Sequence, residues 1–352
     1  MYPVSTAAPS QYCSTPESET ATPMRAILVE KEGDPEHLTL GEHPDPTPAP
    51  DELLVDVHAT ALNRADTMQR RGNYPVPEGA SAILGLEMAG VVAEAGAECA
   101  GWAAGDRVFG LLAGGGYAER TTIHHEEAMP IPEALSFEEA AAVPEVFLTA
   151  YQALHWLGEL KRGERALVHA GASGVGTAAI QLAVEAGAEV LVTASAPKHD
   201  LCRELGARAA IDYRSEDFAA RVKELTGGAG VDVILDFIGA PYFQKNIQSL
   251  RTDGRVIQLA TLGGATVEEV SLRALMAKRV HLKATTLRSR AQGYKIRLSQ
   301  EFAAYALPLF EEGTLRPVTD RVYDWDDAAE AHRRMEANEN AGKLVLRVGG
   351  GM

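Results

Sequence analysis

Small residues at positions 171 to 176 form the group in this sequence that is best suited to bind a ligand. They lie in the segment RALVHAGASGVGTAAIQLA, after a short apolar run and before apolar residues at three- and four-residue spacing. The first pattern is typical of a buried strand and the second of a helix. A glycine turn between them exposes backbone N–H groups at the positive end of the helix dipole, which suits a dinucleotide pyrophosphate. The expected cofactor contacts here are Gly171, Ser173, Gly174, Val175 and Gly176.

The strand-like run that follows indicates which dinucleotide is bound. In NAD-binding folds an acidic residue about 20 positions beyond the glycines accepts the ribose 2′-OH. Here that position is Ala196, with Ser195 and Lys198 close to it and no carboxylate beside it. A 2′-phosphate is then not repelled, and Lys198 can pair with it. The sequence therefore predicts NADPH, with Ser195 and Lys198 as contacts; the alternative for Lys198 is a solvated lysine at a helix start.

Strand-like and helix-like segments alternate from about Phe137 onward. Six strands with crossover helices between them predict an α/β fold with a doubly wound parallel sheet. The expected strands are Arg165–Ala170, Glu189–Ala194, Arg208–Tyr213, Val231–Phe237, Arg255–Ala260 and His281–Leu287. The expected helices lie near residues 174–187, 197–205, 215–226, 241–251 and 271–279.

The rest of the chain has a different pattern. Short strands and turns between Met24 and Ile123 predict a compact, mostly β first domain. A long helix over 294–312, a helix over 326–336 and a last strand over 343–348 do not continue the alternation. We expect this tail to return to the first domain. The dinucleotide-binding domain (148–289) would then be inserted in a catalytic domain made of residues 24–147 and 290–352.

Composition limits the partners and the compartment. The net charge is −16 and no basic block is present, which argues against nucleic-acid and anionic-membrane partners. No run approaches the roughly 18 consecutive apolar residues of a membrane span. The three cysteines, Cys13, Cys99 and Cys202, are far apart and odd in number, so we expect a reducing cytoplasm. Residues 1–23 and the tail 349–351 are expected to be disordered.

Several motifs, taken together, resemble one family. They are ALNRADTMQRRGNYP, ILGLEMAG, AAVPEVFLTAYQAL, HAGASGVGTAAIQLA, VDVILDFIG, LRSR and NAGKLVL. Through them the chain, from Met24 to Val348, resembles the zinc-independent medium-chain dehydrogenase/reductase superfamily, quinone oxidoreductase branch. The resemblance implies a GroES-like catalytic domain built from both chain ends around a Rossmann domain, an active site in the cleft between them, and usually a homodimer.

The resemblance also bears on metal binding. Zinc-dependent relatives have a cysteine where this chain has Asn63 and a histidine where it has Leu86, and they carry a four-cysteine lobe that is missing here. Zinc needs three or four Cys, His or carboxylate ligands, which Glu87 alone does not provide. The adjacent His124 and His125 are expected to face opposite sides of a strand. We therefore expect no metal.

Further cofactor contacts are implied by the resemblance and not by the pattern. They are Tyr213, Asp236, Gly239, Leu262, Gly263, Gly342 and Lys343. Asp236 and Gly239 are expected on the adenosine side, and Leu262 and Gly263 near the nicotinamide. Tyr213 and the pair Gly342 and Lys343 match family positions near the phosphates, although a tight turn explains each glycine equally well. Arg288 and Arg290 are expected either to hold the cofactor or to form a dimer edge.

On the substrate side, the resemblance places Asn63, Asp66 and Tyr74 beside the nicotinamide. Hydride transfer to a quinone needs close stacking and a donor for the developing oxyanion. Tyr74 is the best candidate for that donor, and Ser173 can assist it. Asp66 either orients Tyr74 or caps a helix. Met68 stands where many relatives have a second tyrosine, which argues against a two-tyrosine mechanism.

These expectations lead to one main function and two rivals. The main one is an NADPH-dependent quinone reductase that delivers hydride without a metal. The first rival is an NADPH-dependent reductase of alkenal or enone double bonds, because the same hydride and a nearby proton donor serve both reactions. The second is a nucleotide-binding redox sensor with little turnover, since the sequence shows no strong general acid. In the first two cases the expected partner is a small quinone or enone.

Overall fold

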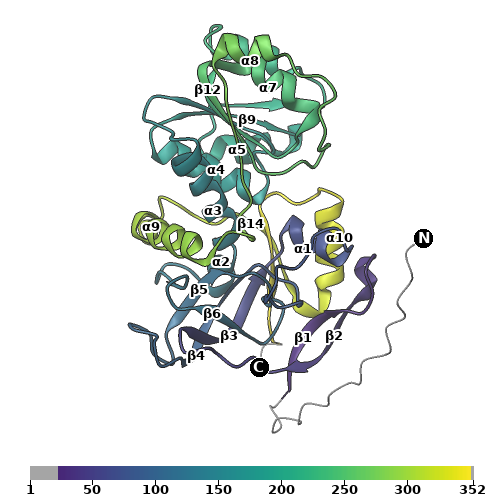
Figure 1. Cartoon of the computed structure of the whole chain (residues 1–352), viewed down its shortest axis with the longest axis vertical. Coiled ribbons are helices and arrows are strands. Elements are labelled where there is room, and N and C mark those ends of the chain that lie inside the picture. The colour runs from purple at the N-terminus through teal and green to yellow at the C-terminus, as the bar shows by residue number, and fades with distance from the viewer. Residues whose placement is uncertain (1–22, 350–352) are drawn as a thin grey trace, which may run out of the picture.

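The computed structural model describes residues 23–349 as two lobes stacked along the long axis of the molecule (Figure 1). Most of the predicted disordered extension, and residues 350–351 of the predicted disordered tail, lie outside the described residues. The prediction was wrong for Pro23, which is the first residue of strand β1 (Pro23–Val29). This strand pairs antiparallel with β2 (Leu38–Pro44), so the chain is already in a hairpin at that point.

The upper lobe contains the predicted parallel sheet of six strands. Its order is β10-β9-β8-β11-β12-β13, so the direction of winding reverses between β8 and β11, as in a doubly wound fold. The strands are β8 (Arg165–Val168), β9 (Glu189–Ala194), β10 (Ala209–Asp212), β11 (Val231–Asp236), β12 (Leu250–Gln258) and β13 (His281–Ala284). All five neighbouring pairs are parallel, which confirms the predicted fold class.

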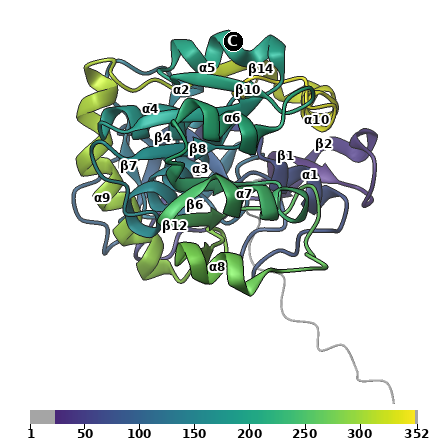
Figure 2. The same ribbon diagram turned by 90° about the horizontal axis from the view of Figure 1, so that it is seen from above.

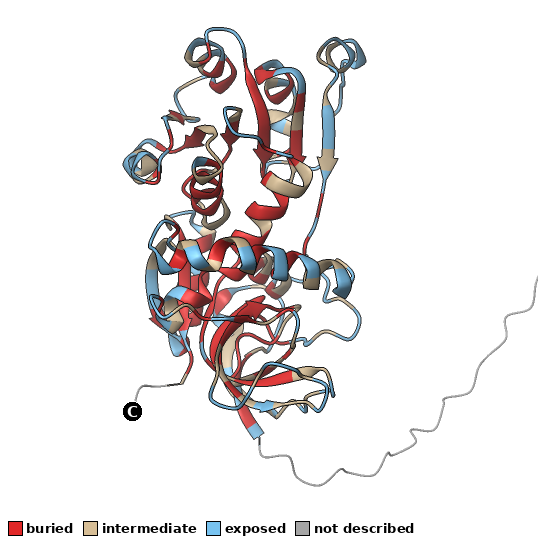
Figure 3. Cartoon of the chain, turned by 90° about the vertical axis from the view of Figure 1, so that its left-hand side faces the viewer, coloured by how far each residue is buried: buried red, intermediate tan, exposed pale blue. Residues whose placement is uncertain are grey.

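Helices cover both faces of this sheet (Figure 2). They are α4 (Gly174–Glu185), α5 (His199–Glu204), α6 (Phe218–Leu225), α7 (Phe243–Ser249) and α8 (Leu272–Lys278). Along β8, Ala166 and Val168 pack with residues of α4 and α5, whereas Leu167 packs with residues of α6 and α7. This alternation follows from the period of two in a strand and explains why the strand sequences are apolar on both faces. Figure 3 shows the resulting buried strands in the centre of the lobe.

The lower lobe is built around a sheet of seven strands from both ends of the chain. These are β3 (Glu52–Ala61), β4 (Glu87–Ala95), β5 (Arg107–Leu111), β6 (Arg120–His124), β7 (Met129–Pro130), β14 (Thr319–Asp324) and β15 (Lys343–Arg347). Strand β15 pairs antiparallel with β3, with Val345 opposite Ala61. The C-terminal segment therefore returns to the first lobe, as predicted, and the parallel sheet is an insertion in a mostly β domain.

The helices of the lower lobe were predicted less completely than its strands. They are α1 (Arg64–Arg70), α2 (Phe137–Ala141), α3 (Pro144–Tyr151, continued by a π-helical turn Gln152–Leu157), α9 (Gln292–Glu311) and α10 (Ala328–Glu336). The segments α9 and α10 match the predicted helices. The sequence offered α1 only as an alternative, through Asp66 as a cap, and gave no bounds for α1 or α2, because each is shorter than the window over which apolar periodicity can be recognised. No helix in residues 23–349 is both long and apolar enough to cross a membrane.

A buried arginine joins the two chain ends within this lobe. Arg70, at the end of α1, is fully buried and donates from Nε to the carbonyl oxygen of Gly33 (3.0 Å). Its Nη1 lies 2.9 Å from Nδ1 of His332, and its Nη2 pairs with Glu336, both on α10. Burial, together with the Arg70 charge, lowers the pKa of His332 to about 3, so this imidazole is neutral and can accept from the guanidinium.

Candidate active site

The glycine turn has the geometry that the sequence predicted. Strand β8 ends at Val168 and α4 begins at Gly174, with Ser173 as the N-cap whose Oγ accepts from the N–H of Gly176 (3.1 Å). A Cβ atom at Gly176 would lie 2.3 Å from the carbonyl oxygen of Ala170, so only glycine fits where the helix crosses the strand end. Ser173 therefore has a structural role as a helix cap, in addition to the assisting role that was predicted for it.

Two backbone donors of this turn are free to bind an anion. Within residues 23–349, the N–H groups of Gly174 and Val175 have no backbone acceptor. A Cβ atom at Gly171 would come within 2.6 Å of Val192, so the turn is closely packed against β9. Unsatisfied N–H groups at a helix N-terminus are the feature that a pyrophosphate needs. The turn thus fits a dinucleotide, whose phosphates it would bind.

The residues predicted near the 2′-position lie at the ends of β9 and β10. The Nζ of Lys198 donates to the carbonyl oxygens of Asn338 (2.9 Å) and Asn340 (2.6 Å), so its side chain is anchored beside the segment that precedes β15. Tyr213 is 45% exposed, and the guanidinium of Arg214 lies 5.8 Å from the centre of its ring.

The turns after β11 and β12 lie next to each other. Gly239, with φ of 86°, forms a bridge with Gly264, and the N–H of Gly263 donates to Ile238 (2.9 Å). Leu262 is 55% exposed at this edge of the sheet. These residues form adjacent loops at the carboxyl ends of parallel strands, where ligands of such sheets bind.

Asp236, by contrast, is not placed to receive adenosine. It is fully buried, and its Oδ1 accepts from the N–H groups of Ile238 (2.6 Å) and Gly239 (3.1 Å). Its Oδ2 accepts from Asn246 (2.9 Å), whose Oδ1 lies 2.8 Å from Nε2 of the buried His169. Both oxygens are used within the protein. The predicted cofactor role of the Asp236 side chain is therefore wrong for this structure, in which it shapes the turn after β11.

A buried polar cluster lies where zinc-dependent relatives have their metal ligands. The Nζ of Lys343 donates to the carbonyl oxygen of Leu62 (2.6 Å), to Oδ1 of Asn63 (2.8 Å) and to Oε1 of Glu87 (2.7 Å). The amide of Asn63 also donates to Oε1 of Glu87 (2.7 Å), while Leu86 points into the core. All three N–H bonds of the ammonium are used here. Lys343 thus holds the catalytic domain together instead of binding a phosphate, and Asn63 is its partner.

Asp66 has the capping role that the sequence left as an alternative. It is fully buried at the third position of α1, and its carboxylate accepts from the N–H groups of Asn63 (2.7 Å) and Gly85 (3.1 Å). Burial raises the pKa of Asp66 to about 6, against these hydrogen bonds, which lower it. Among the described residues no hydrogen bond joins Asp66 to Tyr74, so the structure favours the cap over the alternative in which Asp66 orients Tyr74.

Tyr74 and Arg288 lie against each other. The guanidinium of Arg288 lies 5.4 Å from the centre of the half-buried Tyr74 ring. Its Nε donates to the carbonyl oxygen of Ala113 (2.8 Å), while Nη1 and Nη2 are buried without a partner among the described residues. Arg290 instead donates to Thr285 and lies over Tyr294. Arg288 is therefore the member of this pair that faces the site.

Glu145 is a site residue that sequence reasoning missed. It lies in the first turn of α3, where its own N–H donates to Oε2 of Glu87 (2.8 Å). Its carboxyl Oε2 is buried and unpaired within residues 23–349. Burial, followed by repulsion from Glu87, raises the pKa of Glu145 to about 8. The available signal was a lone carboxylate inside the otherwise apolar motif AAVPEVFLTAYQAL.

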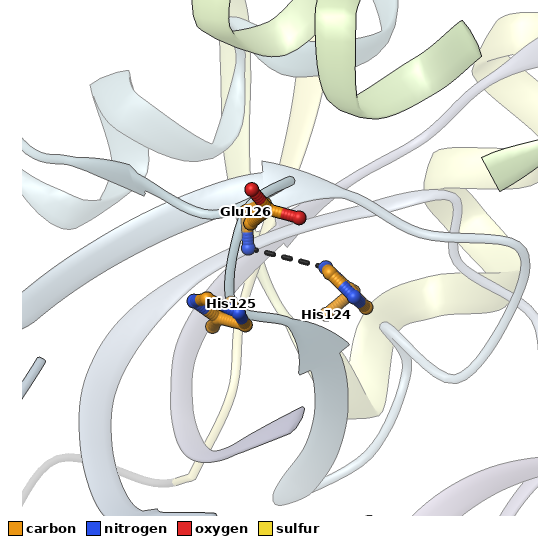
Figure 4. Close-up of side chains that lie close together, drawn as sticks. All are labelled: His124, His125 and Glu126. Carbon is orange, nitrogen blue, oxygen red and sulfur yellow. Dashed lines mark hydrogen bonds between the residues drawn. The ribbon is translucent and has the colours of Figure 1, made fainter. Parts of the chain in front are cut away.

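Two histidines differ from the prediction. His124 is the last residue of β6, so the strand alternation does not extend to His125, and their rings stack with centres 5.1 Å apart. Together with Glu126 they offer ligand atoms within 4.8 Å of one another (Figure 4). However, Nδ1 of His124 accepts from the N–H of Glu126 (3.2 Å). The prediction that the two rings face opposite sides is wrong.

Replacing Lys343 by methionine is expected to destabilise the protein by about 3–5 kcal/mol, because it leaves the buried carboxylate of Glu87 without its cation. Urea unfolding of the variant measures this loss. The double variant K343M/E87Q removes both charges and serves as the control, which should recover most of the stability. If K343M unfolds at the same urea concentration as the parent protein, the ion pair does not stabilise the domain.

Family models match most of the chain. Residues 49–133 match the alcohol dehydrogenase GroES-like domain, and residues 205–346 match a family described as zinc-binding dehydrogenase. The chain is 32% identical over 330 residues to human quinone oxidoreductase, covering 92% of this chain and 97% of that protein. It is 33% identical over 346 residues to the rat synaptic vesicle membrane protein VAT-1 homolog, covering 93% of this chain and 84% of the relative.

Other relatives are parts of larger proteins or solved structures. The chain is 38% identical over 300 residues to the polyketide synthase protein NorB of Streptomyces orinoci, which covers 85% of this chain but only 13% of NorB. A mycobacterial quinone oxidoreductase superimposes with a TM-score of 0.80 at 33% identity, covering 92% and 99% of the two chains. The CurK enoyl reductase superimposes with a TM-score of 0.83 at 27% identity, covering 93% and 99%. With the glycine turn and the two-lobed fold, these matches show a nicotinamide-dinucleotide-dependent oxidoreductase that belongs to the medium-chain dehydrogenase/reductase family, in its zinc-independent, quinone oxidoreductase-like branch.

Proposed function

We propose that this protein is an NADPH-dependent quinone reductase that transfers hydride in the cleft between its lobes without a metal. The observation that carries the proposal is the set of unpaired donors in the cleft, the buried Nη1 and Nη2 of Arg288 beside Tyr74. They suit an acceptor oxygen on which negative charge develops. The similarity to human quinone oxidoreductase over nearly its whole length supports the same reaction.

The metal-free character rests on side chains that are present. Asn63 and Leu86 stand at the two family positions for zinc ligands, and the ammonium of Lys343 lies between Asn63 and Glu87. The cluster thus already contains a cation that neutralises Glu87. NADPH, when bound, supplies the hydride. The residues of the chain bind its pyrophosphate at the glycine turn and orient the acceptor through Tyr74 and Arg288.

A reductase of enone or alkenal double bonds is the second candidate. The superposition on an enoyl reductase favours it, as does the similarity to polyketide synthase proteins. Its chemistry differs because the proton must end on the α-carbon and not on an oxygen, so it demands a stronger proton donor than a quinone does. NADPH oxidation with a panel of ortho-quinones, para-quinones and enones separates the candidates. We expect the quinones to be reduced fastest; faster turnover of the enones would establish the second function, and no turnover would favour a redox sensor.

The preference for NADPH is expected to depend on Lys198. One charge-assisted contact with a phosphate contributes about 1.5–3 kcal/mol, so Lys198→Ala should weaken NADPH binding about 10–100-fold and leave NADH binding nearly unchanged. Fluorescence titration with each cofactor gives both dissociation constants. Arg203→Ala, on the same helical segment and paired with Asp200, is the control. Equal weakening of both cofactors by Lys198→Ala would show that the lysine only holds the segment at Asn338 and Asn340.

Tyr74 is expected to donate to the acceptor oxygen. Quinones accept hydride readily, so the loss of this donor should cost less than the 10²–10³-fold typical of an essential oxyanion donor. Tyr74→Phe should lower turnover roughly 3–30-fold, well below that typical loss. The phenyl ring keeps its contact with Arg288, and the glycine turn is unchanged, so cofactor affinity should stay the same. A variant that reduces quinones at the parent rate would show that the ring is only a wall of the cleft.

The remaining expectations are proposals of the same kind. We propose a homodimer in the cytoplasm, with a catalytic domain of residues 24–147 and 290–352 and a dinucleotide-binding domain of residues 148–289. A dimer is supported by the edge strand β13, where Leu282 is 52% exposed, and by Leu272 and Met276 on α8, which are 68% and 76% exposed. An exposed apolar edge of a sheet is a surface that proteins usually cover. The molar mass in solution tests this.

A further inference from the structure

We propose that Glu145 is the proton donor of this site: its neutral carboxylic acid gives a proton to the acceptor that Tyr74 and Arg288 hold. The inference rests on the reductase function proposed above and adds the acid that the sequence did not reveal. It is carried by three observations about the cluster around Glu145. These are the balance of charges, the distribution of hydrogen bonds, and the position of helix α3 beside the glycine turn.

The charges of the cluster do not balance if every group is ionised. Asp66 on α1 and Glu87 on β4 are fully buried, while Glu145 on α3 is partly exposed with its Oε2 buried. The cations that act on Glu145 are Lys343 on β15 and Arg288 after β13. An unpaired ionised carboxylate is expensive to bury. One of the three carboxyl groups therefore retains a proton, which leaves the cluster with two negative and two positive charges.

Hydrogen bonds decide which carboxyl group is neutral. Asp66 accepts from two backbone N–H groups, and Glu87 accepts from Asn63, Lys343 and the N–H of Glu145. Among residues 23–349 no hydrogen bond reaches either oxygen of Glu145, and Arg288 makes no ion pair with it. Donors stabilise the ionised form of a carboxyl group. The proton therefore stays on Glu145, in agreement with its pKa of about 8, which burial and the charge of Glu87 cause.

The position of Glu145 suits transfer to a bound acceptor. The next residue, Val146, lies so close to the glycine turn that a Cβ atom at Gly174 would be 2.9 Å from its Cγ1. On the other side, Tyr74 is near enough for the charge of Glu145 to raise the pKa of the phenol, after the larger effect of burial. Helix α3 therefore contacts the cofactor turn through Val146, and Glu145, in the first turn of the same helix, is close enough to Tyr74 for its charge to act on the phenol.

The proposed step is balanced in atoms and electrons. The acceptor receives a hydride, with both electrons, from NADPH, which is thereby oxidised to NADP⁺. The O–H bond of Glu145 breaks, and its proton bonds to the oxygen of a quinone or to the α-carbon of an enone. The electron pair of that O–H bond stays on the carboxylate, which regains a proton from water. An acid whose pKa lies near the working pH is well matched to this task.

The first test reads the proton itself, without cofactor or turnover. Infrared spectra of the parent protein between pH 7 and 10, above the pKa of about 6 of Asp66, should show a carbonyl band of a protonated carboxylic acid that disappears with a midpoint near 8. Glu145→Gln should lack this band, and Glu133→Gln, which changes an exposed glutamate, should keep it. A band that persists in Glu145→Gln, or no band near neutral pH in the parent, would overturn the proposal.

The second test follows the reaction. General acid catalysis typically contributes about 10²–10⁴-fold, so Glu145→Gln should lower turnover of enones by up to that factor and of quinones by less. Parent activity should fall as the pH rises through about 8, because the acid loses its proton, whereas the weak activity of Glu145→Gln should not show this fall. Glu145→Asp keeps an acid and should retain the band and regain part of the turnover. An unchanged rate and pH profile in Glu145→Gln would overturn the proposal.

The two tests also separate this inference from the function on which it rests. If the parent protein reduces neither quinones nor enones, the proposed function fails and the proton has no acceptor, whatever the infrared spectra show. If the parent is active and Glu145→Gln is equally active, only the assignment of Glu145 fails. Should Glu145→Gln not fold, Glu145→Asp gives the decision: a retained band whose midpoint moves, together with a matching move of the pH profile, supports the proposal, and parent behaviour in both overturns it.

Discussion

The structure depends on a buried ammonium that joins the two ends of the chain. Lys343 begins the last strand and bonds to Leu62, Asn63 and Glu87 at the end of β3 and the start of β4. A buried ion pair stabilises a fold only when its remaining hydrogen-bonding capacity is filled, and here all three N–H bonds have acceptors. The preceding residue, Gly342, donates to the carbonyl oxygen of Ala172 (2.9 Å), so the same segment fixes the glycine turn against the catalytic domain.

The sequence predicted best what is local in the chain. In the parallel sheet the central strands are apolar on both faces and the strands alternate with crossover helices, so length and periodicity were enough to find all six strands. The catalytic domain depends on pairings between distant segments, such as Val345 with Ala61 and Arg70 with Glu336. No local pattern contains that information. The return of the tail was predicted only because the alternation stopped after Arg290.

The site residues show a second limit, because residue type does not reveal which partners a side chain will have. Lys198 and Lys343 were both predicted to contact the cofactor, yet Lys343 is buried with three acceptors while Lys198 is anchored near the surface. Asp66 and Asp236 were predicted as site residues, but their carboxylates instead accept hydrogen bonds from backbone N–H groups. Polar residues at the ends of strands and helices cap those elements as often as they take part in binding or catalysis. Only the three-dimensional arrangement separates the two roles.

The distribution of hydrogen bonds also explains why Glu145, which the sequence did not reveal, is the reactive carboxyl group. The N-terminus of a helix normally stabilises a carboxylate in its first turn, which would favour ionised Glu145 on α3. In this structure the N–H of Glu145 donates to the carboxylate of Glu87, which also accepts a hydrogen bond from Nζ of Lys343. The charge of Glu87 repels a second charge on its neighbour and thereby raises the pKa of Glu145, after the larger effect of burial. Two carboxyl groups that share one helix end are thus driven to opposite protonation states, and the one without donors keeps the proton beside the cleft.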